Sequence, residues 1–502
     1  MKILCYAAHL KPVARSTFRM PMSVPKTILF RPTRPTPALR GGTVTVAILL
    51  ATALGGCASW LPRTDASPAM VVPTAWTATA PPATSTAAAT TQGLAQWWQK
   101  FNDPLLGSLV TQALQANTSV RTAQAALQQS RALRDVQNAG LLPSVNASGS
   151  AQRSQTGSND PVNTFKVGLD ASWEPDVFGG QHSSVNATEA DAQAAQASLS
   201  DVQVSVAAEV ALAYIQLRGQ QAQLRIAQEN LRSQQETLQI TQWRAQAGLT
   251  TSLEVEQART SSEQTAAQVP LLQANIAKSR HSLAVLTGQT PDALQALVET
   301  PQPIPLAADD LALDIPAQTL RQRPDVRAAE HRISAALARV SVADAARYPS
   351  FSISGSLGLS ALSLSALGDS ASVLRALLGS ISVPLFDGGA ARAQVRAQEA
   401  ALEQARVSYQ STVLTALKDV EDALVALSGD RDRLVRLQAA ATAAANADLL
   451  AQQRYASGLI DFQTVLQTQR TLLTAQDSVA SSQADISADH VRLYKALGGG
   501  WN

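Results

Sequence analysis

Hydrophobic and polar residues alternate along two short stretches in each half of the chain. In TFKVGLDASWEPDVFGG, apolar residues from Phe165 to Trp173 alternate with polar or small ones from Lys166 to Glu174. A period of two over about ten residues predicts a strand with two different faces, and it matches the length of a tilted membrane-spanning strand. Strands are predicted over about 145–152, 165–174, 351–359 and 377–385.

A helical period occupies the longer segments between these stretches. Leucines recur every seven residues at Leu217, Leu224, Leu231 and Leu238. This heptad pattern predicts coiled-coil packing of a helix over about 181–246, which a break at Gly248 separates from a second helix over about 252–286.

The second half has the same helical pattern. Spacings of four and three run from Val413 to Leu427, and Gly458 interrupts the pattern before a last helix. A shorter helix is expected before each pair of strands. The first, capped by Asn102 or Asp103, should run to about Asn138, and the second should end near Arg347.

The two halves are an internal duplication. RAQAGLTT around Gly248 resembles RYASGLID around Gly458, and 458 − 248 gives a separation of 210 residues. Gly288 and Gly498 have the same separation, LPSVNASGS parallels YPSFSISGS, and WEPDVFGG parallels VPLFDGG. Each repeat therefore supplies a short helix, two strands, a long helix, a Gly turn and a second short helix.

The lengths of these elements predict an architecture. A helix over 181–246 would be roughly 100 Å long, and two short helices can stack end to end beside it, with strands at one end and Gly turns at the other. Four strands are too few for a useful membrane barrel, and a spanning sheet must close. Three chains would supply twelve strands, an even number found in outer-membrane barrels. A small soluble hairpin sheet is the alternative.

Charge and cysteine usage point to a leader and a lipid anchor. Eight of the 40 Lys and Arg residues lie in 1–56, which has no acid, so 32 basic residues face 38 acidic ones in the remainder. Nothing there predicts binding to nucleic acid. Val44 to Leu54 reads as the apolar core of a signal peptide, and Leu54-Gly55-Gly56-Cys57 matches a bacterial lipobox, where Cys57 is acylated. An ordinary signal peptide with a chance Cys is the alternative.

Two further features concern the leader and the start of the folded part. The leader is longer than usual, so Met20 or Met22 is a candidate start, and Ala58 after the Cys favours the outer membrane over the inner one. Residues 58–93 are rich in Pro, Thr, Ala and Ser and read as an extended tether. Trp97 and Trp98 are expected to be packing residues.

These motifs together resemble the outer-membrane efflux proteins, the TolC-like outer-membrane factors, and most closely the lipoprotein branch that serves resistance-nodulation-division pumps. The similarity covers the chain from Cys57 to its end and rests on the lipobox, WWQKFNDPLLGSLV, LPSVNASGS, SWEPDVFGG, LRQRPDVRAAEHR, YPSFSISGSLG, VPLFDGG and the two Gly-Leu turns. It implies an α+β membrane protein: a trimer whose twelve-stranded outer-membrane β-barrel, four strands per chain, continues into a long periplasmic α-helical coiled-coil barrel. RPDVRAAE is a family marker that we interpret as structural, with Arg327 and Glu330 placed to pair.

The resemblance also divides the chain into segments. These are a signal peptide (1–56), the lipidated Cys and tether (57–93), the first repeat (94–288), an equatorial inter-repeat segment (289–316), the second repeat (317–498) and a C-terminal end (499–502).

The Gly-Leu turns become the periplasmic tips of two helical hairpins. Six tips in a trimer would ring the lower mouth of the tube and dock a periplasmic adaptor through Gly248, Leu249, Thr250, Gly458, Leu459 and Ile460. Alternatively, the two leucines only seal their own hairpins. Gate candidates follow the second turn at Asp461, Gln463, Thr464 and Gln467.

The charge of the gate is open at this point. Many relatives carry Asp where Gln467 stands, and a ring of amides lacks the cation attraction of a carboxylate ring, so Asp461 could supply charge one turn earlier. The alternative is that all four are solvated turn residues.

The implied function is passive conduction of drugs or other small solutes from an adaptor and an inner-membrane resistance-nodulation-division pump to the cell exterior. Lys166, Asp170 and Glu174 would face the barrel lumen. No nucleophile elbow, metal-ligand spacing or phosphate-binding loop predicts an enzyme, a metal or a cofactor beyond the diacylglycerol and N-acyl chain on Cys57. Alternatives are a channel for protein or peptide secretion and, in another class, a lipid-anchored periplasmic coiled-coil scaffold or adaptor.

Overall fold

The computed structural model describes residues 96–307 and 317–499. The leader, Cys57 and the whole tether lie outside these residues. The first repeat consists of η2 (Trp97–Phe101), α2 (Pro104–Ala116), α3 (Thr118–Ala139), β1 (Ser144–Ser154), β2 (Val162–Trp173), α4 (Gly180–Gln246) and α5 (Ser252–Leu286). After α6 (Gln295–Val298), the second consists of η3 (Ala317–Gln322), α7 (Pro324–Ala345), β3 (Ser350–Ala361), η4 (Ser365–Gly368), η5 (Ser370–Ser372), β4 (Val373–Ser382), α8 (Ala390–Ala456) and α9 (Phe462–Ala496).

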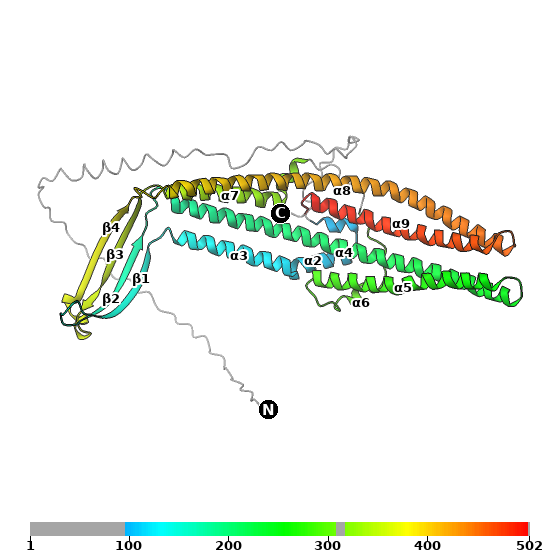
Figure 1. Cartoon of the computed structure of the whole chain (residues 1–502), viewed down its shortest axis with the longest axis horizontal. Helices are drawn as coiled ribbons and strands as arrows, with labels where there is room; N and C mark the ends of the chain where they lie inside the picture. The colour runs from blue at the N-terminus through cyan, green and yellow to red at the C-terminus, as the bar shows by residue number, and fades with distance from the viewer. Residues whose placement is uncertain (1–95, 308–316, 500–502) are drawn as a thin grey trace, which may run out of the picture. The chain divides into compact units, whose positions relative to one another are not determined.

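The two repeats have matching helices. The long helices α4 and α8 have 67 residues each, and α5 and α9 have 35 each. Along α4, α3 packs on the half near the sheet and α5 on the other half, while α7 and α9 divide α8 in the same way (Figure 1). α4 also packs against α7 and α9, which joins the repeats. The predicted end-to-end stacking of short helices beside a long one is confirmed.

The helix before the first strand pair is interrupted, where the sequence predicted a continuous one. Asn117 leaves the helical region at φ −60° and ψ 135°. Its side-chain oxygen accepts the N–H groups of Ser119 and Val120, and its amide donates to the Leu286 carbonyl at 2.8 Å. The break at Asn117 therefore caps α3 and ties it to the end of α5. Asp103, one of the two predicted caps, caps α2 by accepting from Leu105 and Leu106.

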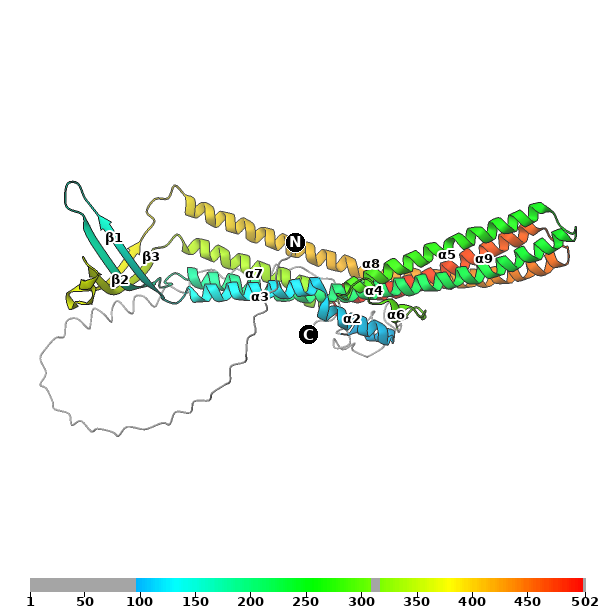
Figure 2. The same ribbon diagram turned by 90° about the horizontal axis from the view of Figure 1, so that it is seen from below.

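The four strands form one antiparallel sheet in the order β1-β2-β3-β4 at one end of the helices, opposite the Gly turns (Figures 1 and 2). The fourth strand is Val373–Ser382 and not 377–385, because Pro384 cannot donate to a ladder. Pairs such as Val167 with Leu359 and Leu357 with Arg375 define one face of the sheet. The neighbouring pairs, such as Asp170 with Ser356, define the other. β1 and β4 are both edges, and no residue of the four strands is buried on either face in the single chain.

The largest core lies where η2, α2, α4, α7, α8 and α9 meet. Trp97 is fully buried and stacks on Tyr494 with a 5.5 Å centroid separation, and Trp98 and Phe101 pack beside it. Both tryptophans are packing residues, as predicted. The inter-repeat segment lies against this region, because Arg218 and Gln221 of α4 donate to the carbonyls of Thr300 and Val298.

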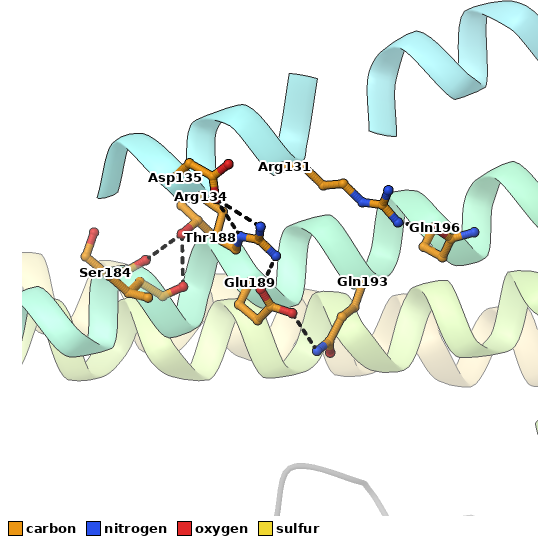
Figure 3. A network of polar contacts seen from close by, with 9 residues as sticks. Arg131, Arg134, Asp135, Ser184, Thr188, Glu189, Gln193 and Gln196 are labelled. Atoms are coloured by element: carbon orange, nitrogen blue, oxygen red, sulfur yellow. Dashed lines mark hydrogen bonds and ion pairs between the residues drawn. The ribbon is translucent and has the colours of Figure 1, made fainter. Parts of the chain in front are cut away.

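Near the sheet, polar contacts replace an apolar core between α3 and α4 (Figure 3). The Arg134 guanidinium donates to Glu189 at 3.1 Å and to Asp135 at 2.9 Å, and Arg131 donates to Gln196 at 2.9 Å. Small side chains such as Ala187 and Ala190 fill the space below. With polar contacts at the surface and small side chains between them, α3 and α4 pack closely without a large apolar core.

The RPDVRAAE segment acts as a structural clamp. Pro324 occupies the first turn of α7, as predicted. The Arg323 guanidinium binds both carboxylate oxygens of Asp325, at 3.0 and 2.8 Å, and also donates to the Ala496 carbonyl at the end of α9. The segment thus fixes the start of α7 against the last helix.

Candidate functional site

Both Gly turns close their hairpins with the same backbone geometry. Gly248 and Gly458 have φ values of 69° and 74°, in the left-handed region that favours glycine. The Leu249 N–H donates to the Arg244 carbonyl at 2.8 Å, and the Leu459 N–H donates to the Arg454 carbonyl at 2.9 Å. Each glycine therefore ends a long helix, and the following leucine closes the six-residue hydrogen bond of a Schellman motif.

The two leucines project from the tips. Leu249 is 76% exposed and Leu459 is 74% exposed. Thr250 and Ile460 are half-buried, and Ile460 packs against the small tip core of Ala258, Ala451, Phe462, Val465 and Leu466. Within the single chain the leucines do not seal their own hairpins, which removes that alternative. Whether the six tip residues dock an adaptor stays a prediction.

A polar network joins the two tips, and the sequence did not reveal it. The Arg244 guanidinium lies 4.9 Å from the centroid of the Tyr455 ring. The Tyr455 hydroxyl donates to Oε2 of Glu254 at 3.0 Å, and the Thr250 hydroxyl donates to the same oxygen. Burial first, and then the bond to Glu254, raise the pKa of Tyr455, so the hydroxyl stays protonated and can donate. We call Arg244, Thr250, Glu254 and Tyr455 the tip network.

One signal in the sequence could have located this network. Tyr455 occupies the position of Ala245 in the first repeat, and Glu254 occupies that of Thr464 in the second. Three members of the tip network, Thr250, Glu254 and Tyr455, thus stand at positions where the repeats differ. Arg244, like the glycines, stands at a position where they agree.

The gate candidates lie on and just after the second turn. Asp461 caps α9: its Oδ1 accepts the backbone N–H of Thr464 at 2.8 Å and the hydroxyl of Thr464 at 2.6 Å. These bonds lower the pKa of Asp461, the side-chain bond being the larger cause. Gln463, Thr464 and Gln467 are exposed. The four are on one tip, and the assignment of a gate to them stays a prediction.

Partly buried polar pairs continue the contact between the hairpins above the tips. The Asn230 amide donates to Gln476 at 2.8 Å, and the Gln469 amide donates to the Thr237 hydroxyl at 3.0 Å. Each pair joins α4 to α9. Asn230 and Gln469 are buried, and a buried polar group that loses its partner is costly, so these contacts favour one register of the two hairpins.

The predicted lumen residues share the polar side of the sheet only in part. Lys166 pairs with Ser150 and Ser360, and Asp170 accepts from the Ser148 hydroxyl at 2.8 Å. These two lie on one face with a row of serines. Glu174 is exposed but lies just beyond the end of β2, at the junction with the helices. Leu374 and Leu378 are also on the polar face, opposite Gly358 and Ser354, which the sequence pattern did not suggest.

A charged recess of about 430 Å³ lies at mid-length between α4, α7, α8 and α9. Asp489 reaches it with its side chain almost fully buried, and one carboxylate oxygen accepts from Arg492 at 2.6 Å. The pKa of Asp489 is raised to about 6, chiefly by burial and also by the nearby Asp430, while Arg492 opposes the shift. Among the described residues, no group of three or more His, Cys, Asp or Glu side chains is arranged to hold a metal ion.

Known proteins share the sequence pattern of these helices and strands. Residues 109–289 and 315–499, one segment per repeat, match the family described as "Outer membrane efflux protein". The chain belongs to this family, as its motifs predicted.

Several relatives are similar over most of their length. The solvent efflux pump outer membrane protein SrpC of Pseudomonas putida is 32% identical over 80% of this chain and 87% of SrpC. Outer membrane protein OprJ of Pseudomonas aeruginosa is 30% identical over 91% of this chain and 95% of OprJ. The solved outer-membrane channel OprN has 37% identity and a TM-score of 0.79, with 87% of this chain and 99% of that chain covered.

Family membership places the protein in the outer membrane, with the helices on the periplasmic side. The fold class predicted from the sequence, an α+β channel protein with a strand region and a long helical region, agrees with these structures. The family consists of outer-membrane channel proteins rather than enzymes.

Proposed function

We propose that the protein is the passive outer-membrane conduit of a tripartite efflux system, which receives solutes from a periplasmic adaptor and an inner-membrane resistance-nodulation-division pump. The single observation that supports this best is the pairing of two exposed Gly-Leu tips with a four-stranded sheet at the opposite end of the same helices. A tube needs both a docking end and a membrane end. A scaffold that only joins partners has no use for the strands.

Three copies form the conduit. β1 and β4 leave their outer backbone groups unpaired in the single chain, and lipid cannot satisfy them. Pairing β4 of one copy with β1 of the next closes a ring, and three copies supply twelve strands. The polar face with Lys166 and Asp170 lines the lumen, and the apolar face contacts lipid.

At the periplasmic mouth, Leu249 and Leu459 insert into the adaptor, since exposed large apolar side chains at a protein end favour a protein contact. The tip network holds the two hairpins of a chain together and keeps the mouth narrow. Opening requires these bonds to break, and Gln463, Thr464 and Gln467 then move apart with α9.

The exported solutes are small organic molecules. Relatives are named for solvent efflux, toluene efflux, antibiotic efflux and pyoverdine export, and these names cover chemically diverse small compounds. Such diversity is expected of a passive conduit that passes solutes without selecting among them.

Cys57 anchors the chain through a diacylglycerol and an N-linked acyl chain. The lipobox supports this, and multiple acyl chains hold a protein stably on a membrane. Metabolic labelling with an alkyne fatty acid should label the wild type and leave Cys57→Ser unlabelled. Equal labelling of both would overturn the anchor.

A photo-crosslinking amino acid placed at Leu249 or at Leu459 in living cells tests the proposed function directly. These sites are preferred over Thr250 and Ile460 because their side chains are the more exposed. Leu133 on α3, which is 53% exposed and far from the tips, is the matched control. Mass spectrometry identifies the captured protein.

Capture of an efflux-pump adaptor at both tips, and not at Leu133, is the expected result. Capture of an adaptor from a protein or peptide exporter would replace efflux with secretion. If both tips capture only further copies of this chain, or no periplasmic protein, the docking role of the tips is wrong.

A further inference from the structure

Two arginines lie on the mainly apolar face of the sheet. The ladders place Arg153 opposite Asn163 and Arg375 opposite Leu357, and both arginines are exposed. Their neighbours on this face include Phe165, Val167 and Leu377. Within the strands, no Asp or Glu occupies this face, and neither guanidinium has a hydrogen-bond or ion-pair partner in the described part of the single chain.

Both arginines lie towards the hairpin loops, away from the helices. Arg153 is the residue before the last of β1, and Arg375 is the third residue of β4. With the helices in the periplasm, this is the outer end of the sheet. An arginine on a lipid-facing strand is least costly near the membrane interface, where its side chain can reach the headgroups.

The internal duplication predicts how two copies join at their edges. Ser144 pairs with Ser172 in the first repeat, and Ser350 pairs with Ser382 in the second, so β1 corresponds to β3 and β2 to β4 in this register. The β2–β3 ladder then serves as the template for β4 pairing with β1 of the next copy. Val167 corresponds to Leu377, because each lies five residues before its serine, and Leu359 corresponds to Arg153, because each lies nine residues after its serine.

The observed pair of Val167 with Leu359 therefore becomes a pair of Leu377 with Arg153 of the next copy. By the same correspondence, Phe165 with Ala361 becomes Arg375 with Gln155 of the next copy. Arg375 and the neighbouring copy's Arg153 are then diagonal neighbours on one face, with Cα atoms roughly 7–8 Å apart. The register is self-consistent, because it sets Gly379 opposite Ala151 and Ile381 opposite Gly149 on the apolar face.

We propose that Arg375 of one copy and Arg153 of the next together bind the phosphate group of an outer-leaflet lipid, once at each of the three seams of the barrel. This rests on the proposed trimeric assembly. Two like charges on a face without carboxylates repel each other unless an anion lies between them. A lipid phosphate is the anion available at that depth, and guanidinium groups bind phosphate oxygens in a bidentate manner.

Lipid binding to the purified trimer in detergent is measured by native mass spectrometry. The probes are diphosphorylated lipid A and its dephosphorylated form. The variant is the double substitution Arg153→Gln and Arg375→Gln. Arg121→Gln on α3, an exposed arginine far from the sheet, is the control. The wild type and the control should bind up to three diphosphorylated lipids, and the double variant should bind them at least tenfold more weakly. Equal binding by the wild type and the double variant would overturn the proposal.

The dephosphorylated probe separates phosphate recognition from apolar contact. It should bind the wild type and the double variant equally and weakly. If it binds the wild type as tightly as the phosphorylated form does, the contact is apolar and the phosphate site is wrong.

A cysteine pair tests the seam independently of lipid. Arg153→Cys with Leu377→Cys should give covalently linked trimers on oxidation, whereas Gln152→Cys with Leu377→Cys, on opposite faces, should not. Trimers that form normally but do not crosslink would overturn the register and the lipid site while leaving the proposed conduit intact. Failure of the unsubstituted protein to form trimers would instead overturn the proposed function.

Discussion

Two carboxylates at the tips, those of Asp461 and Glu254, are engaged within the chain, and this determines what each can do. One carboxylate oxygen of Asp461 accepts hydrogen bonds from Thr464 in the first turn of α9. Glu254 accepts from two hydroxyl groups. A carboxylate that caps a helix is held by that helix and is less free to bind a passing ion. These two carboxylates therefore mainly hold the tips together and are not primarily ion-binding groups.

Substitutions of Asp461 can separate its role as a helix cap from a role as a source of gate charge. Asn caps a helix about as well as Asp but carries no charge, whereas Ala does neither. We expect Asp461→Asn to keep the conductance and ion selectivity of single channels in planar bilayers, and Asp461→Ala to make the conductance noisier. If Asn and Ala shift the reversal potential equally, Asp461 supplies gate charge instead.

The pH dependence of this cap follows from its lowered pKa. A carboxyl group whose folded pKa is depressed stabilises the fold above its unfolded pKa, near 3.9, and loses that contribution as the pH falls through the folded value. Between pH 5 and pH 8 the Asp461 cap should thus leave the channel current unchanged.

Tyr455 tests the tip network. Tyr455→Phe removes the hydroxyl that bonds Glu254 and keeps the ring beneath Arg244. A hydrogen bond to a charged group contributes about 1.5–3 kcal/mol, so, if the bond exists only in the closed state, its loss should raise the ratio of open to closed channels roughly tenfold or more. Single-channel recording measures that ratio. Tyr409→Phe on α8, far from the tips, is the control, and an equal response from it would contradict the network's role.

Asp489 is expected to respond to pH in the opposite direction from Asp461. Its folded pKa is raised to about 6, so the stabilisation that it gives is complete below pH 4 and is lost as the pH rises through about 6. Asp489→Asn should therefore raise the Tm at pH 7.5 and flatten the dependence of Tm on pH between 5 and 7. Thermal unfolding across this range checks it. A steeper dependence in the variant would show that another group titrates there.

At the scale of elements, the duplication made most boundaries predictable. The bounds of α5 agree with the sequence because a Gly turn precedes it and a Gly cap follows it, and these are local signals. The break at Asn117 was missed because its cause, a bond to the Leu286 carbonyl, joins segments far apart in the chain. The tip network escaped for the same reason. Local patterns predict elements, but contacts between segments far apart in the chain require the structure.

The glycines repeated at a separation of 210 residues allow a prediction at this scale. Gly248, Gly288, Gly458 and Gly498 all have a positive φ, but their surroundings differ. At Gly248 an added Cβ would meet nothing within 4 Å, whereas at Gly288 it would lie 2.6 Å from the Ala116 carbonyl oxygen. Gly248→Ala should cost about 1–2 kcal/mol from backbone strain alone, and Gly288→Ala should cost more because backbone must also shift. The order of the two Tm values checks it, and equal losses would contradict it.

At the scale of the whole molecule, a single chain leaves its membrane end incomplete. Leu385 and Phe386, in the turn from β4 to α8, are each 93% exposed. The equivalent turn of the first repeat carries Phe178, which stacks on Tyr348 and Phe351 at the start of β3, with centroid separations of 5.0 and 6.4 Å. The second repeat has no third repeat to pack against, so in the proposed trimer the start of β1 of the next copy covers this turn.

Phe386→Ser therefore tests the assembly. In the register of the seam, the surface that should cover Phe386 contains Leu142 and Val145 of the next copy, which are 68% and 64% exposed in the single chain. Burying a Phe side chain stabilises by about 1.5–3 kcal/mol, and the trimer has three such contacts. Phe386→Ser should hence shift the trimer towards monomers in light scattering at low protein concentration. Phe178→Ser, whose contacts lie within one chain, should instead lower the Tm with less effect on the oligomeric state. If the two variants behave alike, the turn from β4 to α8 does not lie at the seam, and another surface must join the copies.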